Sequence, residues 1–333
     1  MLFQVALLLC SSRLALSGSF RDFIPNVKGC TVPAAACPNS NISFYLYTQE
    51  NEHNPHRLDV SKMESITGAP FSAGKPAIVL IHGYTGHRDY SPNKEIRPAY
   101  LSHGDYNIIS VDYQPLALPG CYVHAAYSTT IVGNCTAQVL DAVMAAHKMK
   151  LSQLHVIGFS LGGQVASQIP LFLKTGAIPR ITGLDPAQPL FVAAQETSRL
   201  SADDADFVDV IHTNSGVKGV YAAVGDVDFY VNGGSSQPGC DSSYPDGGAD
   251  SCSHARAPAF YAESISSESS FWGYRCRSWV TKMMGCYSTT DVPVIMGEKT
   301  PPSARGVYYV KTRARPPFAL GKGSSPCPDQ RPQ

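Results

Sequence analysis

Ser160 stands in a pattern that is typical of a nucleophilic serine. Glycines lie two positions before and two positions after it, in Gly158-Phe159-Ser160-Leu161-Gly162. A GxSxG pattern alone is weak, since a chain rich in Gly and Ser contains it by chance. Here the buried apolar run 154–157 precedes it and a helix-like stretch follows. This order predicts a nucleophile elbow, in which a side chain at either glycine would collide with the turn. The alternative is a serine that only caps a helix.

A serine hydroxyl is a poor nucleophile without a base, and the base needs an acid to orient it. Asp185 directly follows the next apolar run, 181–184, and Pro186 ends that run. A carboxylate at the end of the neighbouring strand can reach the same sheet edge as Ser160. Three further acids are expected to be solvated or structural: Asp203, Asp204 and Asp209.

The chain offers two candidates for the base, His212 and His254. His212 ends an apolar run but is followed by Thr213-Asn214-Ser215-Gly216, which favours a capping and packing role. His254 comes just after Cys252, where a disulfide would hold its loop, and just before a predicted helix. We favour His254, a choice that also depends on the family resemblance given below.

These residues require a sheet whose strand ends meet at one edge. Continuous apolar runs, typical of strands buried on both faces, occur at Ala77–Ile81, Ile108–Val111, Leu154–Ile157, Ile181–Leu184 and Val208–Ile211. Helical stretches are expected at Thr136–Met149, Gly162–Leu173 and Ser253–Ile265. Strands and helices in alternation predict an α/β fold with a mostly parallel central sheet covered by helices on both faces.

Composition excludes several classes. Lys+Arg 26 balance Asp+Glu 26, so nucleic acid is not an expected partner. With 16% charged and 44% hydrophobic residues, disorder and coiled coil are excluded.

The length of 333 residues allows one large domain. We expect a signal peptide at residues 1–18, the α/β domain at 19–320 and a C-terminal tail at 321–333. The segment from Pro316 onward is expected to lie on the surface or to be mobile.

The N-terminus predicts secretion. The apolar run 2–9 is too short to span a bilayer, and Ala15-Leu16-Ser17 offers the small residues of a cleavage site. No Lys or Arg precedes the run, and a membrane anchor is the alternative. No later stretch is long and apolar enough to be a transmembrane segment. Two sequons predict glycans, an exposed one at Asn41 and one at a helix start at Asn134.

Ten cysteines agree with an oxidising compartment. No CxxC pair occurs, so a zinc or thioredoxin-type site has little support. We expect no cofactor and no metal. Without Cys10 of the signal peptide the number is odd, so one thiol stays free. We expect it to be Cys135, because a buried helix follows it, and we expect an N-terminal cysteine to reach Cys121. The pairs that close short loops are the expected disulfides: Cys240–Cys252 and Cys276–Cys286.

Five motifs occur in an order that resembles the catalytic domain of the pancreatic lipase family, especially its insect neutral lipases and venom-type phospholipases A1. The resemblance covers roughly residues 28–319 and implies an α/β-hydrolase fold with Ser160 as nucleophile, Asp185 as acid and His254 as base. The motifs are Gly158-Phe159-Ser160-Leu161-Gly162-Gly163, Gly183-Leu184-Asp185-Pro186-Ala187, Val208-Asp209-Val210-Ile211-His212-Thr213-Asn214, Asp228-Phe229-Tyr230-Val231-Asn232-Gly233-Gly234 with Gln237-Pro238-Gly239-Cys240, and Cys252-Ser253-His254-Ala255-Arg256-Ala257.

An oxyanion hole requires backbone N–H groups aimed at the reacting carbonyl oxygen. The N–H of Leu161, directly after the nucleophile, is one expected donor. The resemblance places the second at Tyr84, in the loop His82-Gly83-Tyr84-Thr85-Gly86. A simple glycine turn is the alternative interpretation of that loop.

Departures from the family pattern bear on the substrate. Larger members carry a second, lipid-binding β-sandwich domain; we expect none here, and therefore no colipase as a partner. The eleven residues between Cys240 and Cys252 include three Asp and cannot form the apolar helical face of a lid. The segment 213–227, which also flanks the entrance, is likewise shorter than in the triglyceride lipases of this family. A short, polar rim favours a phospholipase A1-type member with weak or absent interfacial activation.

The family often carries a calcium site after the catalytic acid. Glu196, Arg199 and Asp204 match its spacing, but Ser201 stands where an Asp ligand is usual. Calcium prefers several carboxylate oxygens, so we expect no tight calcium site.

The sequence therefore predicts a secreted, extracellular carboxylic ester hydrolase. It would act through an acyl-enzyme on acylated lipids at a membrane or lipid-droplet surface, as a phospholipase A1-like enzyme or a neutral lipase. The alternative is a catalytically silent, yolk-protein-like lipid-binding protein. A serine peptidase has no motif support beyond the three residue types.

Overall fold

The computed structural model describes residues 28–243, 248–266, 270–275 and 292–322. The predicted signal peptide at 1–18 and all but two residues of the predicted tail at 321–333 lie outside the described residues. So does the predicted Cys276–Cys286 disulfide. Within the described ranges, no helix is long and apolar enough to cross a bilayer.

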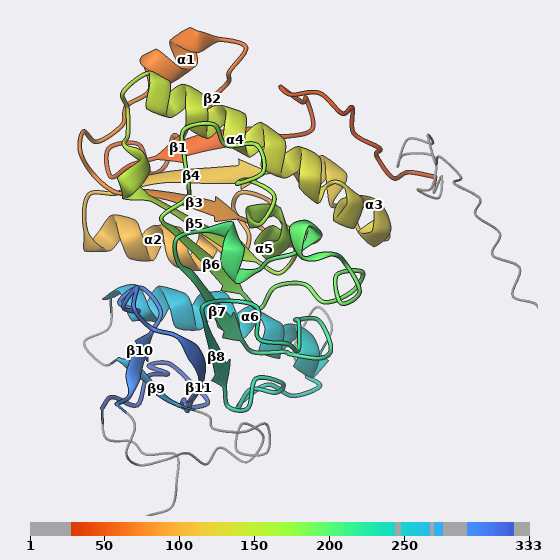
Figure 1. The fold of residues 1–333 in the computed structure, drawn as a ribbon, viewed down its shortest axis with the longest axis vertical. Helices are drawn as coiled ribbons and strands as arrows, with labels where there is room; N and C mark the ends of the chain where they lie inside the picture. The colour runs from red at the N-terminus through yellow and green to blue at the C-terminus, as the bar shows by residue number, and fades with distance from the viewer. Residues whose placement is uncertain (1–27, 244–247, 267–269, 276–291, 323–333) are drawn as a thin grey trace, which may run out of the picture.

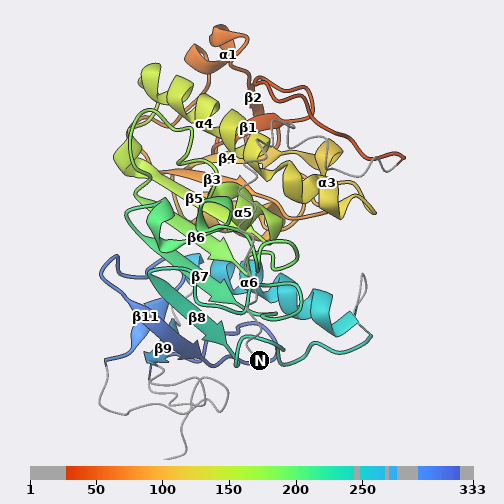
Figure 2. The same cartoon turned by 45° about the vertical axis from the view of Figure 1, so that its right-hand side comes forward.

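One sheet organises the described residues, and Figures 1 and 2 show it twisting from β1 and β2 to β9 and β11. Its order is β10-β9-β11-β8-β7-β6-β5-β3-β4-β1-β2. The seven strands from β4 to β11 pair in parallel, while β1, β2, β9 and β10 add antiparallel pairs at the two edges. The bounds are β1 Ser43–Tyr47, β2 His56–Leu58, β3 Ala77–Ile81, β4 Asn107–Asp112, β5 Leu154–Phe159, β6 Arg180–Leu184, β7 Val208–His212, β8 Val227–Val231, β9 Phe271–Arg275, β10 Val294–Met296 and β11 Gly306–Val310.

Helices cover both faces of this sheet. On one face α2 packs along α6, and on the other α4 packs along α5, with α1 and α3 beside α4. The bounds are α1 Met63–Thr67, α2 Asn93–His103, α3 Tyr122–Tyr127, α4 Thr129–Ala145, α5 Leu161–Ala166 and α6 Gly248–Ser266, with 3-10 turns η2 Gln114–Leu116, η3 Leu151–Gln153, η4 Glu196–Ser198 and η5 Ala202–Asp204.

Strand β3 shows why continuous apolar runs predicted this arrangement. Its five side chains are all buried, with Ala77, Val79 and Ile81 in the core under α4 and α5. Ile78 and Leu80 lie in the other core, under α2 and α6. A strand that is buried on both faces needs no polar alternation. The mostly parallel sheet with two covered faces is therefore confirmed, and all five predicted runs are strands.

Helix α4 corrects the predicted helix at Thr136–Met149. It begins seven residues earlier, at Thr129, and ends at Ala145. Gly133 is a poor helix former, but a Cβ there would lie 2.5 Å from Cβ of Gln168, so the glycine permits a close helix contact. Asn134 consequently lies inside the helix rather than at its start, and its Oδ1 accepts a hydrogen bond from Gln138. Asn41 is partly exposed rather than exposed.

Two further segments differ from expectation. The helix predicted at Gly162–Leu173 ends at Ala166, and Pro170 explains why no regular helix continues through this segment. The chain after Pro316 does not simply lie on the surface, because Phe318 and Ala319 are buried. Their N–H groups donate to the carboxylate of Glu263 at 2.8 and 2.7 Å.

Three disulfides occur in the described residues. Cys240–Cys252 is confirmed, and so is the expected link from the N-terminal segment to Cys121, which Cys30 makes. The prediction of Cys135 as the free thiol is wrong, because it pairs with Cys37. Cys135 is buried in α4, but Cys37 of the N-terminal segment contacts the same helix and pairs with it there.

Candidate functional site

Ser160 occupies a sharp turn between β5 and α5. Its φ of 55° and ψ of −119° lie outside helix and strand geometry. Its N–H donates to Leu184 O in β6, and its carbonyl accepts the N–H of Ala187, which fixes the turn against the neighbouring strand. The predicted strand, sharp turn and helix are therefore present.

The two flanking glycines are required sterically. A Cβ at Gly158 would lie 2.2 Å from the carbonyl oxygen of Gly162. A Cβ at Gly162 would lie 2.2 Å from the carbonyl oxygen of Ile81, at the end of β3. Both contacts are with backbone, which cannot rotate away as a side chain can.

Asp185 follows β6, the strand next to β5, and is fully buried. Its Oδ2 lies 2.6 Å from Nδ1 of His254. Its carboxylate also accepts the backbone N–H groups of Thr213 and Asn214, at 2.8 and 3.1 Å, from the end of β7. The pattern places a proton on Nδ1 of His254 and leaves Nε2 as its acceptor nitrogen.

The ring of His254 lies against the strand end that carries Ser160. Its centroid is 4.6 Å from that of Phe159, the residue directly before the serine. The structure thus brings Ser160, Asp185 and His254 to one edge of the sheet. Within the described residues the Ser160 hydroxyl makes no hydrogen bond, and catalytic hydrogen bonds commonly shorten only when substrate binds.

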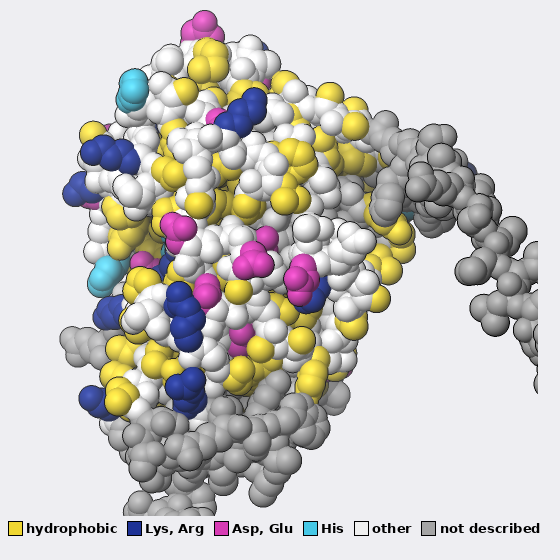
Figure 3. Space-filling view, in the orientation of Figure 1, with side chains coloured by type: hydrophobic (Ala, Val, Ile, Leu, Met, Phe, Trp, Pro, Cys, Tyr) yellow, Lys and Arg dark blue, Asp and Glu magenta, His cyan; other side chains and the backbone are white. Residues whose placement is uncertain are grey.

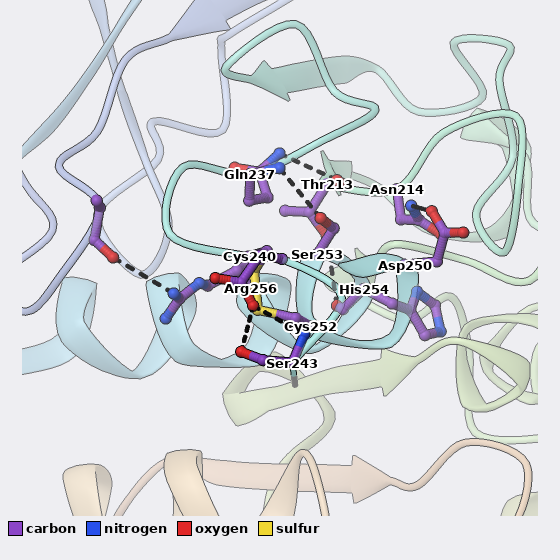
Figure 4. The surroundings of a disulfide bond; sticks show 12 residues. Thr213, Asn214, Gln237, Cys240, Ser243, Asp250, Cys252, Ser253, His254 and Arg256 are labelled. Atoms are coloured by element: carbon purple, nitrogen blue, oxygen red, sulfur yellow. Dashed lines mark hydrogen bonds between the residues drawn. A yellow bond between two sulfur atoms is a disulfide. The ribbon is translucent and has the colours of Figure 1, made fainter. Parts of the chain in front are cut away.

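His254 is carried by the second turn of α6, not by a loop before a helix. The Cys240–Cys252 disulfide joins that helix to the preceding chain two residues before the histidine (Figure 4). Figure 4 also shows Asn214 bonded to Asp250, the helix residue one turn before His254, at 3.0 Å. These links fix the position of the imidazole relative to Asp185.

Two backbone N–H groups flank Ser160 without an acceptor in the described residues. Leu161 is the first residue of α5, where N–H groups have no partner within the helix. Tyr84 follows Gly83, whose Cβ position would lie 2.9 Å from Cβ of Ser160. The ring of Tyr84 packs edge-on against Tyr122. The loop after β3 and the start of α5 can therefore both present donors beside the serine.

His82 holds that loop in place. Its buried ring stacks on Tyr113 at 4.1 Å, and its Nδ1 donates to the carbonyl of Gly83 at 2.8 Å. Its Nε2 accepts the N–H of Tyr113 at 3.1 Å. Because both ring nitrogens are used, the glycine turn has a fixed backbone.

The rejected candidates take structural roles. His212 is buried, stacks on Tyr230 and lies 2.8 Å from Asp228, so its predicted packing role is confirmed. Asp209 pairs with Arg180 at 2.8 Å, and this ion pair raises the pKa of that guanidinium. Neither residue belongs to the cluster around His254.

The segment with the calcium-like spacing shows local contacts. Glu196 and Arg199 lie 3.8 Å apart, and Asp204 accepts the N–H of Ser201 at 2.8 Å. Burial raises the pKa of Asp204 to about 7. In the described ranges, no cluster of three His, Cys, Asp or Glu side chains could hold a metal ion.

Several contributors were not predicted from sequence. Thr213 and Asn214 act through main-chain N–H groups, which carry no side-chain signal. Gly219 packs so closely on Asp185 that a Cβ there would lie 2.3 Å from Oδ1. Its position three residues after Gly216, in a glycine-containing loop between two strands, is the only sequence sign of this approach.

The sheet topology, the serine at a strand–helix turn and the adjoining Asp–His pair define an α/β hydrolase. The family model described as Lipase matches residues 13–318. The chain belongs to the lipase family, and the resemblance to pancreatic lipases and its α/β-hydrolase fold are confirmed.

Individual relatives support this assignment. Pancreatic lipase-related protein 2 of Sus scrofa is 32% identical over 284 residues, which cover 79% of this chain and 60% of that protein. Probable phospholipase A1 magnifin of Vespa magnifica is 31% identical over 306 residues, covering 88% and 89%. Inactive pancreatic lipase-related protein 1 of Homo sapiens is 33% identical over 254 residues, covering 71% and 54%. The chain thus spans little more than half the length of its pancreatic lipase-related relatives.

Among solved structures, the α/β hydrolase MGS-M1 from a deep-sea metagenome library is 17% identical, with a TM-score of 0.30 over 54% of this chain and 72% of that chain. The fold assignment rests on the topology described above and on the family match.

Proposed function

We propose that this chain is a secreted carboxylic ester hydrolase that cleaves acylated lipids through Ser160, His254 and Asp185. The observation that carries the proposal is the 2.6 Å contact between His254 and the buried Asp185, at the sheet edge where Ser160 occupies the elbow. Both the family match and the phospholipase A1 relatives support hydrolysis of a carboxylic ester.

The proposed first step forms an acyl-enzyme. Ser160 Oγ attacks the ester carbonyl while its proton passes to Nε2 of His254, and Asp185 stabilises the imidazolium that results. The N–H groups of Leu161 and Tyr84 would donate to the oxyanion, an interaction worth about 3 kcal/mol per donor in comparable sites. Collapse of the tetrahedral intermediate breaks the ester C–O bond, and the alcohol leaves with the proton of His254.

The second step releases the acyl group. Water attacks the acyl carbonyl as His254 takes its proton, and the C–O bond to Ser160 breaks as the serine regains a proton. The products are a fatty acid and free enzyme. Each proton moves between groups at the same sheet edge, so the described residues suffice for both steps.

A phospholipase A1-like activity is favoured over a neutral lipase. Of the eleven residues between Cys240 and Cys252, residues 248–251 form the first turn of α6, and 241–243 are exposed. Ala249 and Asp250 of that turn are exposed as well, and they do not make an apolar lid face. We expect little rise in rate when substrate passes from monomers to an interface. The three disulfides support a secreted protein, since such bonds persist in oxidising compartments.

A non-catalytic lipid-binding role is the competing function, and one relative is named as inactive. The test compares wild type with Ser160→Ala on 4-nitrophenyl butyrate and phosphatidylcholine. We expect turnover to fall at least 10³-fold without loss of thermal stability, because only the nucleophile is removed. Ser167→Ala, at the end of the same helix, is the matched control and should retain activity. An inactive wild type, or an active Ser160→Ala, would overturn the proposal.

A second readout tests the acyl-enzyme itself. A long-chain alkylphosphonate ester should add covalently to wild type, and peptide mass spectrometry should place the adduct on Ser160. Labelling elsewhere, or equal labelling of Ser160→Ala, would contradict the assigned nucleophile.

A further inference from the structure

The loop between β7 and β8, residues 213–226, lies along the chain that follows Asp185. Gln188 N–H donates to the carbonyl of Lys218 at 2.8 Å, and Ala187 forms a bridge with Gly219. Since Gly219 packs directly on the Asp185 carboxylate, the backbone of Lys218 is one residue away from the candidate active site.

The side chain of Lys218 extends towards the base. Its Nζ donates to Oγ of Ser251, in the first turn of α6. Ser251 precedes His254 by three residues, and residues so spaced lie on the same helical face. Ser251, which holds the ammonium, therefore lies three residues, ~4.5 Å along the helix axis, before His254.

This cation lacks a carboxylate partner in the described part of the chain. No Asp or Glu oxygen there lies within 4.0 Å of Nζ, and Lys218 is partly buried. The nearest acid, Asp250, accepts a hydrogen bond from Nδ2 of Asn214 at 3.0 Å. Burial lowers the pKa of Lys218, and Asp250 opposes that effect. A partly desolvated ammonium gains more from an anion than a hydrated one does.

The surroundings fit a lipid rather than a free anion. Val217 and Tyr221 of the same loop are 51% and 37% exposed, and Leu190 and Val192 of the adjoining chain are 55% and 70% exposed. Exposed apolar side chains in the same loop as a cation, and in the segment bonded to that loop at Gln188, match the boundary between acyl chains and phosphates. Figure 3 shows that apolar side chains and scattered charges of both signs are mixed over one face of the molecule.

We propose that Lys218 is a subsite for the phosphate of a glycerophospholipid whose acyl ester is held at Ser160. The inference rests on the proposed function and names its substrate class. The glycerol backbone separates ester and phosphate by a distance of the same order as the helical turn between His254 and Ser251. A diacylglycerol has no phosphate to meet the ammonium, so the subsite would select phospholipid over neutral glyceride.

The test measures selectivity. Lys218→Met removes the charge and keeps the length of the side chain, and Lys218→Arg keeps the charge. Each is compared with wild type on phosphatidylcholine and on diacylglycerol of the same acyl chains, both in non-ionic detergent micelles. We expect Lys218→Met to lower the ratio of the two kcat/KM values about tenfold, and Lys218→Arg to restore most of it. Lys75→Met, at the opposite sheet edge next to Asp105, is the control and should leave the ratio unchanged.

The outcomes separate the two proposals. A wild type that hydrolyses no ester overturns the proposed function and this inference with it. An active wild type whose ratio is the same in Lys218→Met overturns the inference alone. If Lys218→Met does not fold, inhibition of wild-type hydrolysis of 4-nitrophenyl butyrate by glycerol 3-phosphorylcholine decides. The subsite is supported if the inhibition is competitive and if Lys218→Arg weakens it less than Lys218→Gln does. No inhibition of the wild type refutes the subsite.

Discussion

Replacing Gly162 by Ala should displace the backbone that supports Ser160 in the candidate active site. The added Cβ would lie 2.2 Å from the carbonyl oxygen of Ile81 and 2.6 Å from that of His82. An ordinary carbon–oxygen contact is longer by about 1 Å, so the end of β3 and the start of α5 must separate by roughly that amount. The loop that carries Tyr84 would move away from Ser160.

The expected loss follows from that displacement. A misplacement of about 1 Å in a catalytic constellation costs on the order of 10²-fold in rate. Overpacking of this kind also destabilises by about 1–3 kcal/mol, partly offset by about 1 kcal/mol from the better helix propensity of Ala. We therefore expect Gly162→Ala to fold but to lose about 100-fold in kcat/KM.

Gly163→Ala is a matched control in the same helix. Its nearest contact would be 3.2 Å from Cβ of Pro186, a side chain that needs to give by only a few tenths of an ångström. The helix propensity gain is the same at both positions. Hydrolysis of 4-nitrophenyl butyrate gives kcat/KM, and urea unfolding gives stability. If the two variants keep equal activity, the steric argument for the elbow glycine is wrong.

Three further predictions concern the site and the scaffold. Asp185→Asn keeps the shape of the side chain but turns an NH2 towards one of the three N–H donors that Asp185 accepts. We expect kcat to fall about 10⁴-fold, as for the same change in a serine protease triad. A loss of less than tenfold would contradict the role of Asp185 as the acid. Removing both cysteines of Cys37–Cys135 should cost about 3 kcal/mol in urea unfolding, because Cys30–Cys121 already closes most of the same loop; an unchanged midpoint refutes this. Burial holds the pKa of His155 well below 6.5, so below that pH the unfolded chain takes up a proton that the folded chain does not, and stability falls. When the pH is lowered from 7.5 to 5.5, the free energy of unfolding of His155→Gln should therefore fall by about 1.4 kcal/mol less than that of wild type. Parallel pH profiles of the two proteins would exclude this linkage.

The central strands could be predicted because their residues face two cores at once. Edge strands gave no such signal: β1 alternates buried and half-buried residues, and β2 has only three residues. Strand β8 was not predicted, although its run with Asp228 at the second position resembles that of β7 with Asp209. The buried Asp228 carboxylate contacts His212 of β7 at 2.8 Å, and a side-chain contact between strands cannot be recognised before the strand order is known.

The residues of the candidate site also include some that the sequence could locate and some that it could not. Ser160 and Asp185 could be located because each directly follows an apolar run, and adjacent parallel strands bring their ends together. His254 required the family resemblance, since the residues around it do not distinguish a base from a structural histidine. The partner of Cys135 lies almost a hundred residues away, and no local pattern specifies such a contact.

The loop 213–226 combines a fixed backbone with exposed side chains, and under the proposed function this would separate orientation of the acid from selection of the substrate. Its backbone is fixed at both ends: Thr213 and Asn214 donate to Asp185, while Val224 and Gly225 donate to Asp228. In between, His212 contacts the carbonyl of Val220 at 3.1 Å. The side chain of Val217 is exposed, and that of Lys218 bonds to Ser251 of α6. Under the proposed function, we expect substitutions at these two positions to change which lipid binds while the contacts that hold the Asp185 carboxylate stay in place.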